Sequence, residues 1–172
     1  NPRLQGFRNR MKTEGIPVTE LRCDYARVGL ALYGAAEGTA ARSLGLRPVL
    51  SFRARVASVR DVAKGESVGY DRAFTARRKS RIAVLPIGYA DGYPRTAPAG
   101  TPVLVGGRRA TLAGRVSMDM LAVDLSDLPE ARVGDPVELW GAGLSVDEVA
   151  RACGTLGYEL LSKVTARVPR RY

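Results

Sequence analysis

From residue 47 onward, the sequence is a succession of short apolar segments separated by glycine, proline and charged residues. In the first segment Leu50, Phe52, Ala54 and Val56 alternate with serine or arginine, which is the two-residue period of a half-buried β-strand. Similar short segments follow at 81–87, 101–105, 109–112, 121–125 and 137–140. A series of six or more short strands predicts a compact, mainly β domain with a barrel-like sheet.

Turn and helix signals complete this pattern. Gly106-Gly107 lies between two of the segments and predicts a hairpin turn. Ser145 and Glu148 have the spacing of a capping box, so we expect a helix to begin there and to end near Gly154. A second short helix is predicted over residues 158–164. The predicted β domain therefore carries two late helices.

The first 46 residues differ from the rest. Leu21–Gly34 is apolar and punctuated by glycine, which favours a buried strand that opens into a turn. Residues 35–46 form a connector of mostly small side chains. We therefore place a domain boundary there, with a piece of a first domain at 1–46 and the β domain at 47–172.

The centre of the chain, from Ala83 to Asp119, contains the strongest candidate for a functional loop. An apolar run ends in Gly88, and Gly92 follows four residues later, so two residues of unusual backbone freedom bracket this loop. Between Tyr89 and Arg95 the loop displays an aromatic ring, a carboxylate and a guanidinium group. Rigid loops beside buried strands commonly carry binding and catalytic residues. The alternative is an ordinary hairpin with a tyrosine covering the edge of the core.

The chain is strongly basic, with 27 lysine and arginine residues against 17 aspartate and glutamate residues and a net charge of +10. Such a charge suits nucleic acid or anionic lipid, so a basic β-barrel module that binds nucleic acid is one alternative function. The arginines are scattered, however, and aromatic residues make up only 6% of the chain. A solvated, arginine-rich surface is therefore favoured, and we expect no nucleic-acid partner.

Other functional classes are limited by what the sequence lacks. There is no histidine, and Cys23 and Cys153 are the two cysteines, too few for a zinc site built from cysteine and histidine. We therefore expect no metal. No apolar run approaches the roughly 18 residues of a membrane helix, so we expect no membrane span in this chain.

Several motifs, in this order, resemble the carboxyl-terminal part of the alanine racemase family. They are Arg27–Gly34, Val68-Gly69-Tyr70, Ile87–Arg95, Gly114–Asp119 and Arg167–Arg170. Within that family, residues 23–29 and 70–78 are most similar to the serine/alanine racemases of vancomycin-resistance type. The resemblance covers the chain from about Leu21 to its end.

This resemblance implies a fold and a cofactor. Members of the family have an amino-terminal (β/α)₈ barrel, which carries pyridoxal 5′-phosphate on a lysine, followed by a β domain. Residues 1–46 would then be the end of the barrel. None of the four lysines of this chain lies in a motif like the cofactor-bearing one, so the fragment would be inactive alone. Family members form head-to-tail homodimers in which each β domain completes the partner's active site.

The resemblance also assigns site residues. Tyr70 matches the catalytic tyrosine that is supplied to the partner subunit. Arg27 matches the arginine facing the pyridine nitrogen of the cofactor, and the backbone N–H groups of Gly29 and Leu30 match those that hold its phosphate. Met118 matches a residue whose backbone N–H faces the substrate carboxylate. The substrate channel would be lined by Tyr89, Asp119, Arg95 and Arg115; for both arginines a structural ion pair is an equal alternative.

The implied function is racemisation of L- and D-alanine for cell-wall precursors, in the cytoplasm, with or without a membrane anchor outside this chain. Ala166 stands where we expect a tyrosine that narrows the site in alanine racemases, which predicts that serine is also accepted. A non-catalytic dimerisation domain is the second alternative, because the cofactor lysine is absent.

Overall fold

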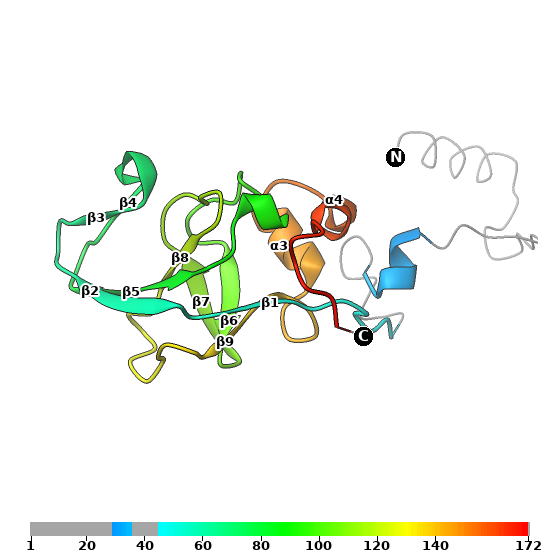
Figure 1. Ribbon diagram of the computed structural model, residues 1–172, viewed down its shortest axis with the longest axis horizontal. Helices are drawn as coiled ribbons and strands as arrows, with labels where there is room; N and C mark the ends of the chain where they lie inside the picture. The colour runs from blue at the N-terminus through cyan, green and yellow to red at the C-terminus, as the bar shows by residue number, and fades with distance from the viewer. Residues whose placement is uncertain (1–28, 36–44, 172) are drawn as a thin grey trace, which may run out of the picture.

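The computed structural model describes residues 29–35 and 45–171, and its main feature is a seven-stranded antiparallel sheet (Figure 1). The strand order is β1-β9-β6-β7-β8-β5-β2. The strands are β1 (Phe52–Arg55), β2 (Ser58–Val62), β5 (Ser80–Leu85), β6 (Pro102–Val105), β7 (Arg108–Leu112), β8 (Leu121–Asp124) and β9 (Pro136–Trp140).

The sheet is curled, as its order requires. Strands β1 and β2 occupy its two opposite edges, yet only Val56 and Ala57 separate them in the chain. Val56 N–H donates to Asp135 O beside β9, and Ala57 N–H donates to Val84 O of β5. One continuous segment therefore connects the two ends of the strand order, and the predicted barrel-like, mainly β fold is confirmed.

A small arm extends from the sheet beyond β2 and β5 (Figure 1, upper left). It consists of β3 (Ser67–Val68) and β4 (Phe74–Thr75), which pair with each other, and of the 3₁₀ turn η3 (Tyr70–Arg72) between them. A separate small core of Val62, Val68, Ala76, Ile82 and Ala113 packs where the arm meets the sheet.

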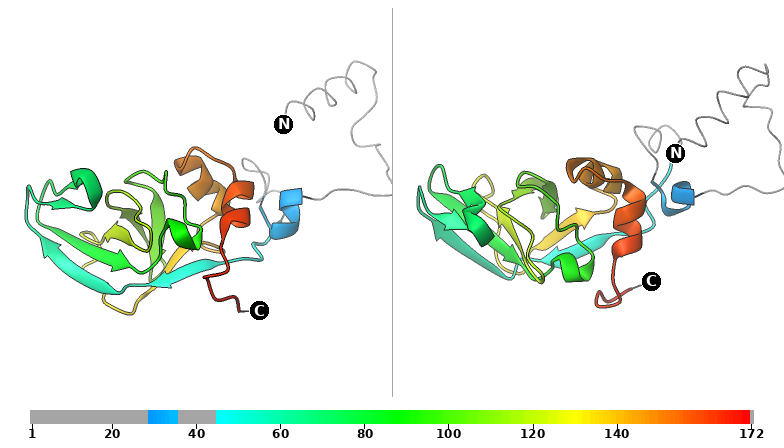
Figure 2. Two further views of the ribbon diagram at one scale, coloured as in Figure 1. Left: turned by 45° about the horizontal axis from the view of Figure 1, so that its top comes forward. Right: turned by 90° about the horizontal axis from the view of Figure 1, so that it is seen from above.

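The helices lie together at the other end of the molecule (Figure 2). Helix α3 (Val146–Ala152) packs against α4 (Gly157–Lys163), and the 3₁₀ helix η2 (Gly29–Tyr33) lies nearby. A further 3₁₀ turn, η4 (Tyr89–Asp91), follows β5. Both late helices are therefore confirmed. Ser145 caps α3 by accepting a hydrogen bond from Asp147 N at 3.2 Å.

The main core fills the curled sheet and is closed by aromatic rings. Trp140 is fully buried, with Phe52 at 4.5 Å on one side and Tyr93 stacked at 5.9 Å, measured between ring centroids. Buried aromatic groups contribute the largest areas to a core of this size. Because only Gly92 separates Tyr93 from η4, this packing anchors the loop after β5.

Two expectations about local structure need correction. Residues 29–33 form the 3₁₀ helix η2 and not a strand, since Gly29 and Gly34 both have left-handed φ angles that break an extended run. Residues 21–28 of the predicted 21–34 segment lie outside the described residues. Strand β2 was not predicted, because its sequence offers only two apolar residues, Val59 and Val62.

Candidate active site

One groove brings together all six residues that the sequence assigns to catalysis, substrate binding and the channel. Its volume is about 840 Å³, within the range of small-molecule sites. The residues are Tyr70, Tyr89, Arg95, Arg115, Met118 and Asp119. They come from three separate segments: η3, the loop after β5 and the loop before β8.

Tyr70 lies at the tip of the arm and projects from its own fold. Its side chain is 69% exposed, although tyrosine usually buries most of its ring. The turn is closed by a hydrogen bond from Ala73 N to Tyr70 O, and Gly69 enters it with a φ of 79°. The ring is therefore presented to the groove and to whatever adjoins it.

The Tyr89 loop is docked against the loop that carries Met118. Tyr89 N donates to Ser117 O at 3.1 Å, and Ala90 N donates to Met118 O at 3.0 Å. A Cβ atom on Gly88 would lie 2.3 Å from both of these carbonyl oxygens. Gly88 has a φ of −151°, an angle that any residue adopts. It is therefore required for close approach and not, as we expected from the sequence, for its backbone angle.

Side chains on this loop are held as well. The Asp91 carboxylate accepts a hydrogen bond from Gly88 N at 2.8 Å and so closes η4. The guanidinium carbon of Arg95 lies 5.8 Å from the centre of the Tyr89 ring, in the range of a cation–π contact. Gly92, in contrast to Gly88, does adopt a left-handed φ of 107°. The loop is a fixed wall of the groove.

Arg167 joins two of these segments, and no role was assigned to it from the sequence. Its Nη2 donates to Asp119 Oδ1 at 2.7 Å, and its Nε lies 3.5 Å from Asp91 Oδ1. The hydrogen bond to Asp119, followed by the charge of Asp91, raises the pKa of the Arg167 guanidinium. Its place in the tail motif was visible in the sequence, but its partners lie 48 and 76 positions away.

Arg115 also has a carboxylate partner. Its Nη1 donates to Asp71 Oδ2 at 2.7 Å, across the groove from the loop before β8 to the tip of the arm. The alternative of an ion pair, which the sequence left open for Arg115, is therefore realised. For Arg95 no salt bridge is found among the described residues.

The residues assigned to the cofactor phosphate lie at the opposite end of the molecule, in η2. Gly29 is exposed, with a φ of 61°, and Leu30 N donates to the Tyr158 hydroxyl at 3.1 Å. A Cβ on Gly29 would lie 2.7 Å from that hydroxyl, and the positive φ also disfavours other residues, so glycine is favoured there. Arg27 lies outside the described residues.

Tyr158 was not predicted. It supplies a phenol beside the Gly29-Leu30 loop from α4. This contact does not test the expectation that Ala166 makes room for serine, which stays a prediction. The sequence signal is weak, because Tyr158 and Leu30 are separated by 128 positions.

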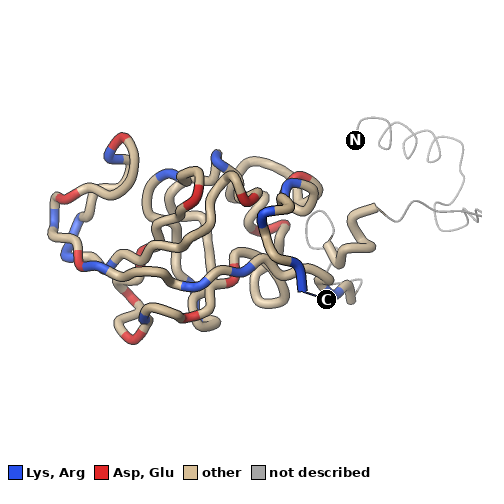
Figure 3. Tube along the Cα trace, viewed as in Figure 1, with Lys and Arg blue, Asp and Glu red and all other residues tan. Residues whose placement is uncertain are grey.

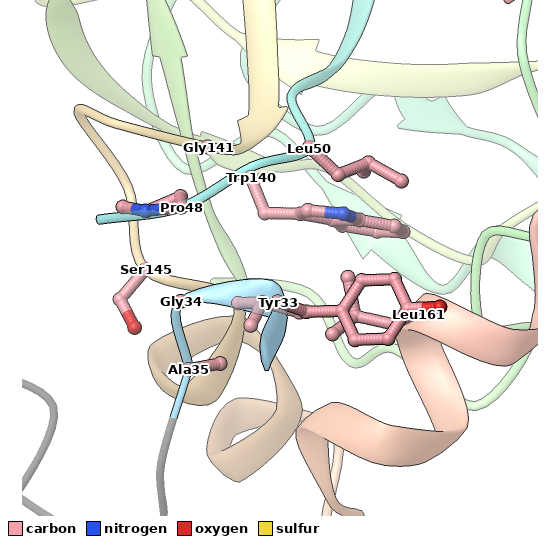
Figure 4. A pocket seen from close by; sticks show the side chains of 10 residues that line it. Tyr33, Gly34, Ala35, Pro48, Leu50, Trp140, Gly141, Ser145 and Leu161 are labelled. Carbon is pink, nitrogen blue, oxygen red and sulfur yellow. The ribbon is translucent and has the colours of Figure 1, made fainter. Parts of the chain in front are cut away.

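A second pocket lies between η2 and the core but is too small for a substrate. Figure 4 shows the Tyr33 ring beside Leu161 and below the indole of Trp140. The pocket has a volume of about 10 Å³, room for about one water molecule. It marks the packing of η2 on the β domain.

Basic and acidic residues are interspersed along the described chain (Figure 3). Several are paired, among them Arg78 with Asp127 and Arg109 with Glu148. These arginines therefore meet carboxylates of the same chain. Within residues 29–35 and 45–171, no helix is both long and apolar enough to cross a bilayer, and no cluster of potential metal ligands is found.

The fold and the groove define a class: an antiparallel β domain that presents an exposed tyrosine, with a second, glycine-lined loop at its far end. Residues 49–172 match the family model described as alanine racemase, C-terminal domain. This chain belongs to the alanine racemase family and comprises its carboxyl-terminal domain. The alternatives of a nucleic-acid-binding module and a non-catalytic dimerisation domain receive no support.

Relatives agree in sequence and in structure. The biosynthetic alanine racemase of Pseudomonas aeruginosa is 74% identical over 151 residues, which cover 87% of this chain and 42% of that protein. Its crystal structure superposes with a TM-score of 0.82 and 75% identity over 84% of this chain and 41% of that one. The alanine racemase of Stutzerimonas stutzeri is 61% identical over 86% of this chain and 42% of its own length.

A third relative carries the expected cofactor. The alanine racemase of Bartonella henselae, solved with covalently bound pyridoxal phosphate, superposes with a TM-score of 0.75 and 34% identity over 84% of this chain and 40% of its own. This chain thus spans less than half the length of these relatives. They are named alanine racemases, and the closer similarity to enzymes of vancomycin-resistance type finds no support.

Proposed function

We propose that this chain is the carboxyl-terminal part of a pyridoxal-phosphate-dependent alanine racemase, and that it contributes to two active sites of a head-to-tail homodimer. One observation carries the proposal. Tyr70 in η3 and the Gly29-Leu30 loop in η2 lie at opposite ends of the long axis of one chain (Figures 1 and 2). They cannot meet in a single site unless a second copy supplies one of them.

Tyr70 would supply one of the acid/base groups that the reaction needs. Racemisation removes a proton from one face of Cα and delivers a proton to the other, so two acid/base groups must flank that carbon. The chemistry that pyridoxal phosphate supplies when bound is delocalisation of the negative charge left on Cα. Tyr70 would hold or release the proton on one face through its phenol oxygen. The second group, a lysine in the family, lies outside this chain.

The residues of η2 suit the cofactor phosphate. Because the Tyr158 oxygen accepts from Leu30 N, its own hydrogen is available to donate. A phenol hydroxyl beside an exposed glycine can meet an anion. Because Leu30 N–H is engaged with the phenol oxygen, Gly29 N–H and the Tyr158 hydroxyl would hold the phosphate directly. Leu30 N–H would fix that hydroxyl, and Arg27 would lie at the pyridine nitrogen by resemblance.

The groove suits a small amino acid. Among the described residues nothing accepts a hydrogen bond from Met118 N, so this N–H is available for the substrate carboxylate. Arg95 would attract the same carboxylate along the channel, since it lacks an acidic partner in the described chain. Tyr89 and Asp119 would form the channel wall.

Further parts of the proposal rest on the family alone. We place the boundary between the barrel remnant and the β domain near residue 46, three residues before the family match begins. Alanine is the proposed substrate, for supply of D-alanine to cell-wall precursors in the cytoplasm.

The test is Tyr70→Phe in the complete protein that contains this chain, which removes one hydroxyl. Loss of a general acid/base group should lower the racemisation rate of alanine by about 10²–10⁴-fold. Tyr33→Phe is the matched control, because Tyr33 is also exposed but lies outside the groove. Equal activity of the Tyr70→Phe and Tyr33→Phe variants would refute the proposal.

A further inference from the structure

The turn that carries Tyr70 has an unusual backbone. Asp71 and Arg72, which follow it directly, have left-handed φ angles of 57° and 52°. They are the two non-glycine residues with positive φ among residues 29–35 and 45–171. Side chains with a Cβ resist this conformation, and such outliers persist only where surrounding contacts maintain them. The question is which contact maintains this one.

The hydrogen bonds of the arm itself are few. Strands β3 and β4 pair over two residues each, with a bond between the Ser67 and Thr75 hydroxyls and two more backbone bonds at the base of the arm. At the tip, the turn adds the bond from Ala73 N to Tyr70 O. Within the described part of the chain, the tip receives one ion pair from outside the arm, the contact of Asp71 Oδ2 with Arg115 Nη1 at 2.7 Å. It spans 44 positions and joins the tip to the loop that carries Met118.

The loop of Arg115 lies close enough to the arm to hold it. Gly114 has a φ of 84°, and a Cβ there would lie 3.2 Å from Val68 O and 3.6 Å from Phe74 Cβ. Both strands of the arm therefore face this loop. Asp71 and Arg115 also line the same groove as Tyr70. The ion pair is thus placed to set the distance between Tyr70 and the opposite wall.

We propose that Asp71 is a positioning residue for Tyr70, and that it acts through Arg115. This inference rests on the proposed racemase function. The side chains of the pair are 67% and 62% exposed, and exposed pairs contribute little to global stability. Its effect should therefore be seen in catalysis by Tyr70 and not in the unfolding of the domain. Arg115 is then engaged with Asp71, which leaves Arg95 as the guanidinium that meets the substrate.

The test uses exchange of the Cα hydrogen in deuterated water, measured separately for L- and D-alanine with the complete protein. Because each acid/base group serves one face of Cα, misplacing Tyr70 should slow exchange from one enantiomer. Asp71→Asn keeps a side chain that tolerates left-handed φ but removes the charge. We expect it to slow exchange from that enantiomer about tenfold or more, with the other enantiomer changed much less.

Two further variants sharpen the result. Arg115→Gln should have the same one-sided effect, and the double variant should be no slower than either single variant, since both break one contact. Asp127→Asn is the matched control. It breaks an exposed ion pair, in which Asp127 Oδ1 lies 2.5 Å from Arg78 Nη2, and neither residue lines the groove. It should leave both exchange rates unchanged.

Each other outcome has a distinct meaning. Equal slowing of both enantiomers by Asp71→Asn, together with a lower melting temperature, would make Asp71 merely structural and overturn the inference. Unchanged rates would also overturn it. If Tyr70→Phe slows exchange from one enantiomer while Asp71→Asn does not, the inference fails and the proposed function stands. If Tyr70→Phe slows neither, the proposed function itself fails.

Discussion

Cys153 shows how burial of one group makes the domain sensitive to alkali. It lies in the core between α3 and α4, and burial raises its pKa from 9.0 to about 11, although a hydrogen bond with Thr101 opposes this and Glu159 adds to it. The thiol loses its proton in the unfolded chain at lower pH than in the folded one. The free energy of unfolding should therefore fall as pH rises from 9 to 11.

The predicted loss is at most about 3 kcal/mol, since the pKa shift is about two units and each unit corresponds to about 1.4 kcal/mol. Urea unfolding at a series of pH values measures it. Cys153→Ala should flatten this part of the profile, even though it lowers stability at every pH. Both profiles are best compared in a Tyr93→Phe background, because burial also raises the pKa of Tyr93. If the free energy of unfolding still fell between pH 9 and 11 in the Cys153→Ala variant, the fall could not be attributed to the Cys153 thiol.

Single residues also show which features can be predicted from one sequence and which cannot. Gly106 and Gly107 were correctly predicted as a hairpin turn, and both have positive φ, because turn chemistry is local. Asp71 gave no signal, since nothing in its neighbours requires a left-handed angle. Arg167 and Tyr158 have clear roles in the structure, but their partners are distant in the chain and could not be paired from one sequence.

At the scale of elements, the site depends on how the loop after β5 docks on the loop before β8. The hydrogen bonds from Tyr89 N and Ala90 N to Ser117 O and Met118 O require Gly88 to approach without a side chain. Gly88→Ala places a Cβ against two backbone oxygens, which cannot move as a flexible side chain can. We expect a cost of about 2 kcal/mol or more and a misplaced Tyr89.

A matched glycine separates this steric effect from backbone strain. Gly100 has a φ of 92° but open space around its Cβ position, so Gly100→Ala should cost only about 1–2 kcal/mol of strain. Urea unfolding gives the stabilities. Racemisation by the complete protein should fall for Gly88→Ala and stay near normal for Gly100→Ala. If Gly88→Ala left stability and activity unchanged, the two loops would not be docked as described.

Elements with a regular apolar period were predicted well, and irregular ones were not. Strands β5, β6, β7, β8 and β9 lie within one or two residues of the predicted ranges. Strand β2 alternates too weakly to be seen, because it forms one edge of the sheet and pairs only with β5. The apolar run 29–33 has the composition of a strand, but the glycines at its ends turn it into η2.

At the scale of the whole molecule, the domain separates the two loops to which we assign roles in the proposed function. The α3–α4 end holds the loop of Gly29 and Leu30, and the arm at the other end holds Tyr70 (Figure 1). The composition and the strand pattern predicted a β domain, but they did not predict that these two loops lie at opposite ends of it. The resemblance of five motifs to the alanine racemase family supplied the expectation that two subunits share each active site. The separation of the two ends gives that expectation a physical reason within one chain.

Mixed dimers test the shared site most directly. Subunits with Tyr70→Phe are combined with subunits in which the cofactor-bearing lysine of the preceding barrel is replaced, each being inactive alone. If Tyr70 acts on the partner's substrate, half of the dimers are mixed and one of their two sites has both groups, so about a quarter of normal activity should return. A mixture that stays as inactive as its parents would show that Tyr70 acts within its own subunit.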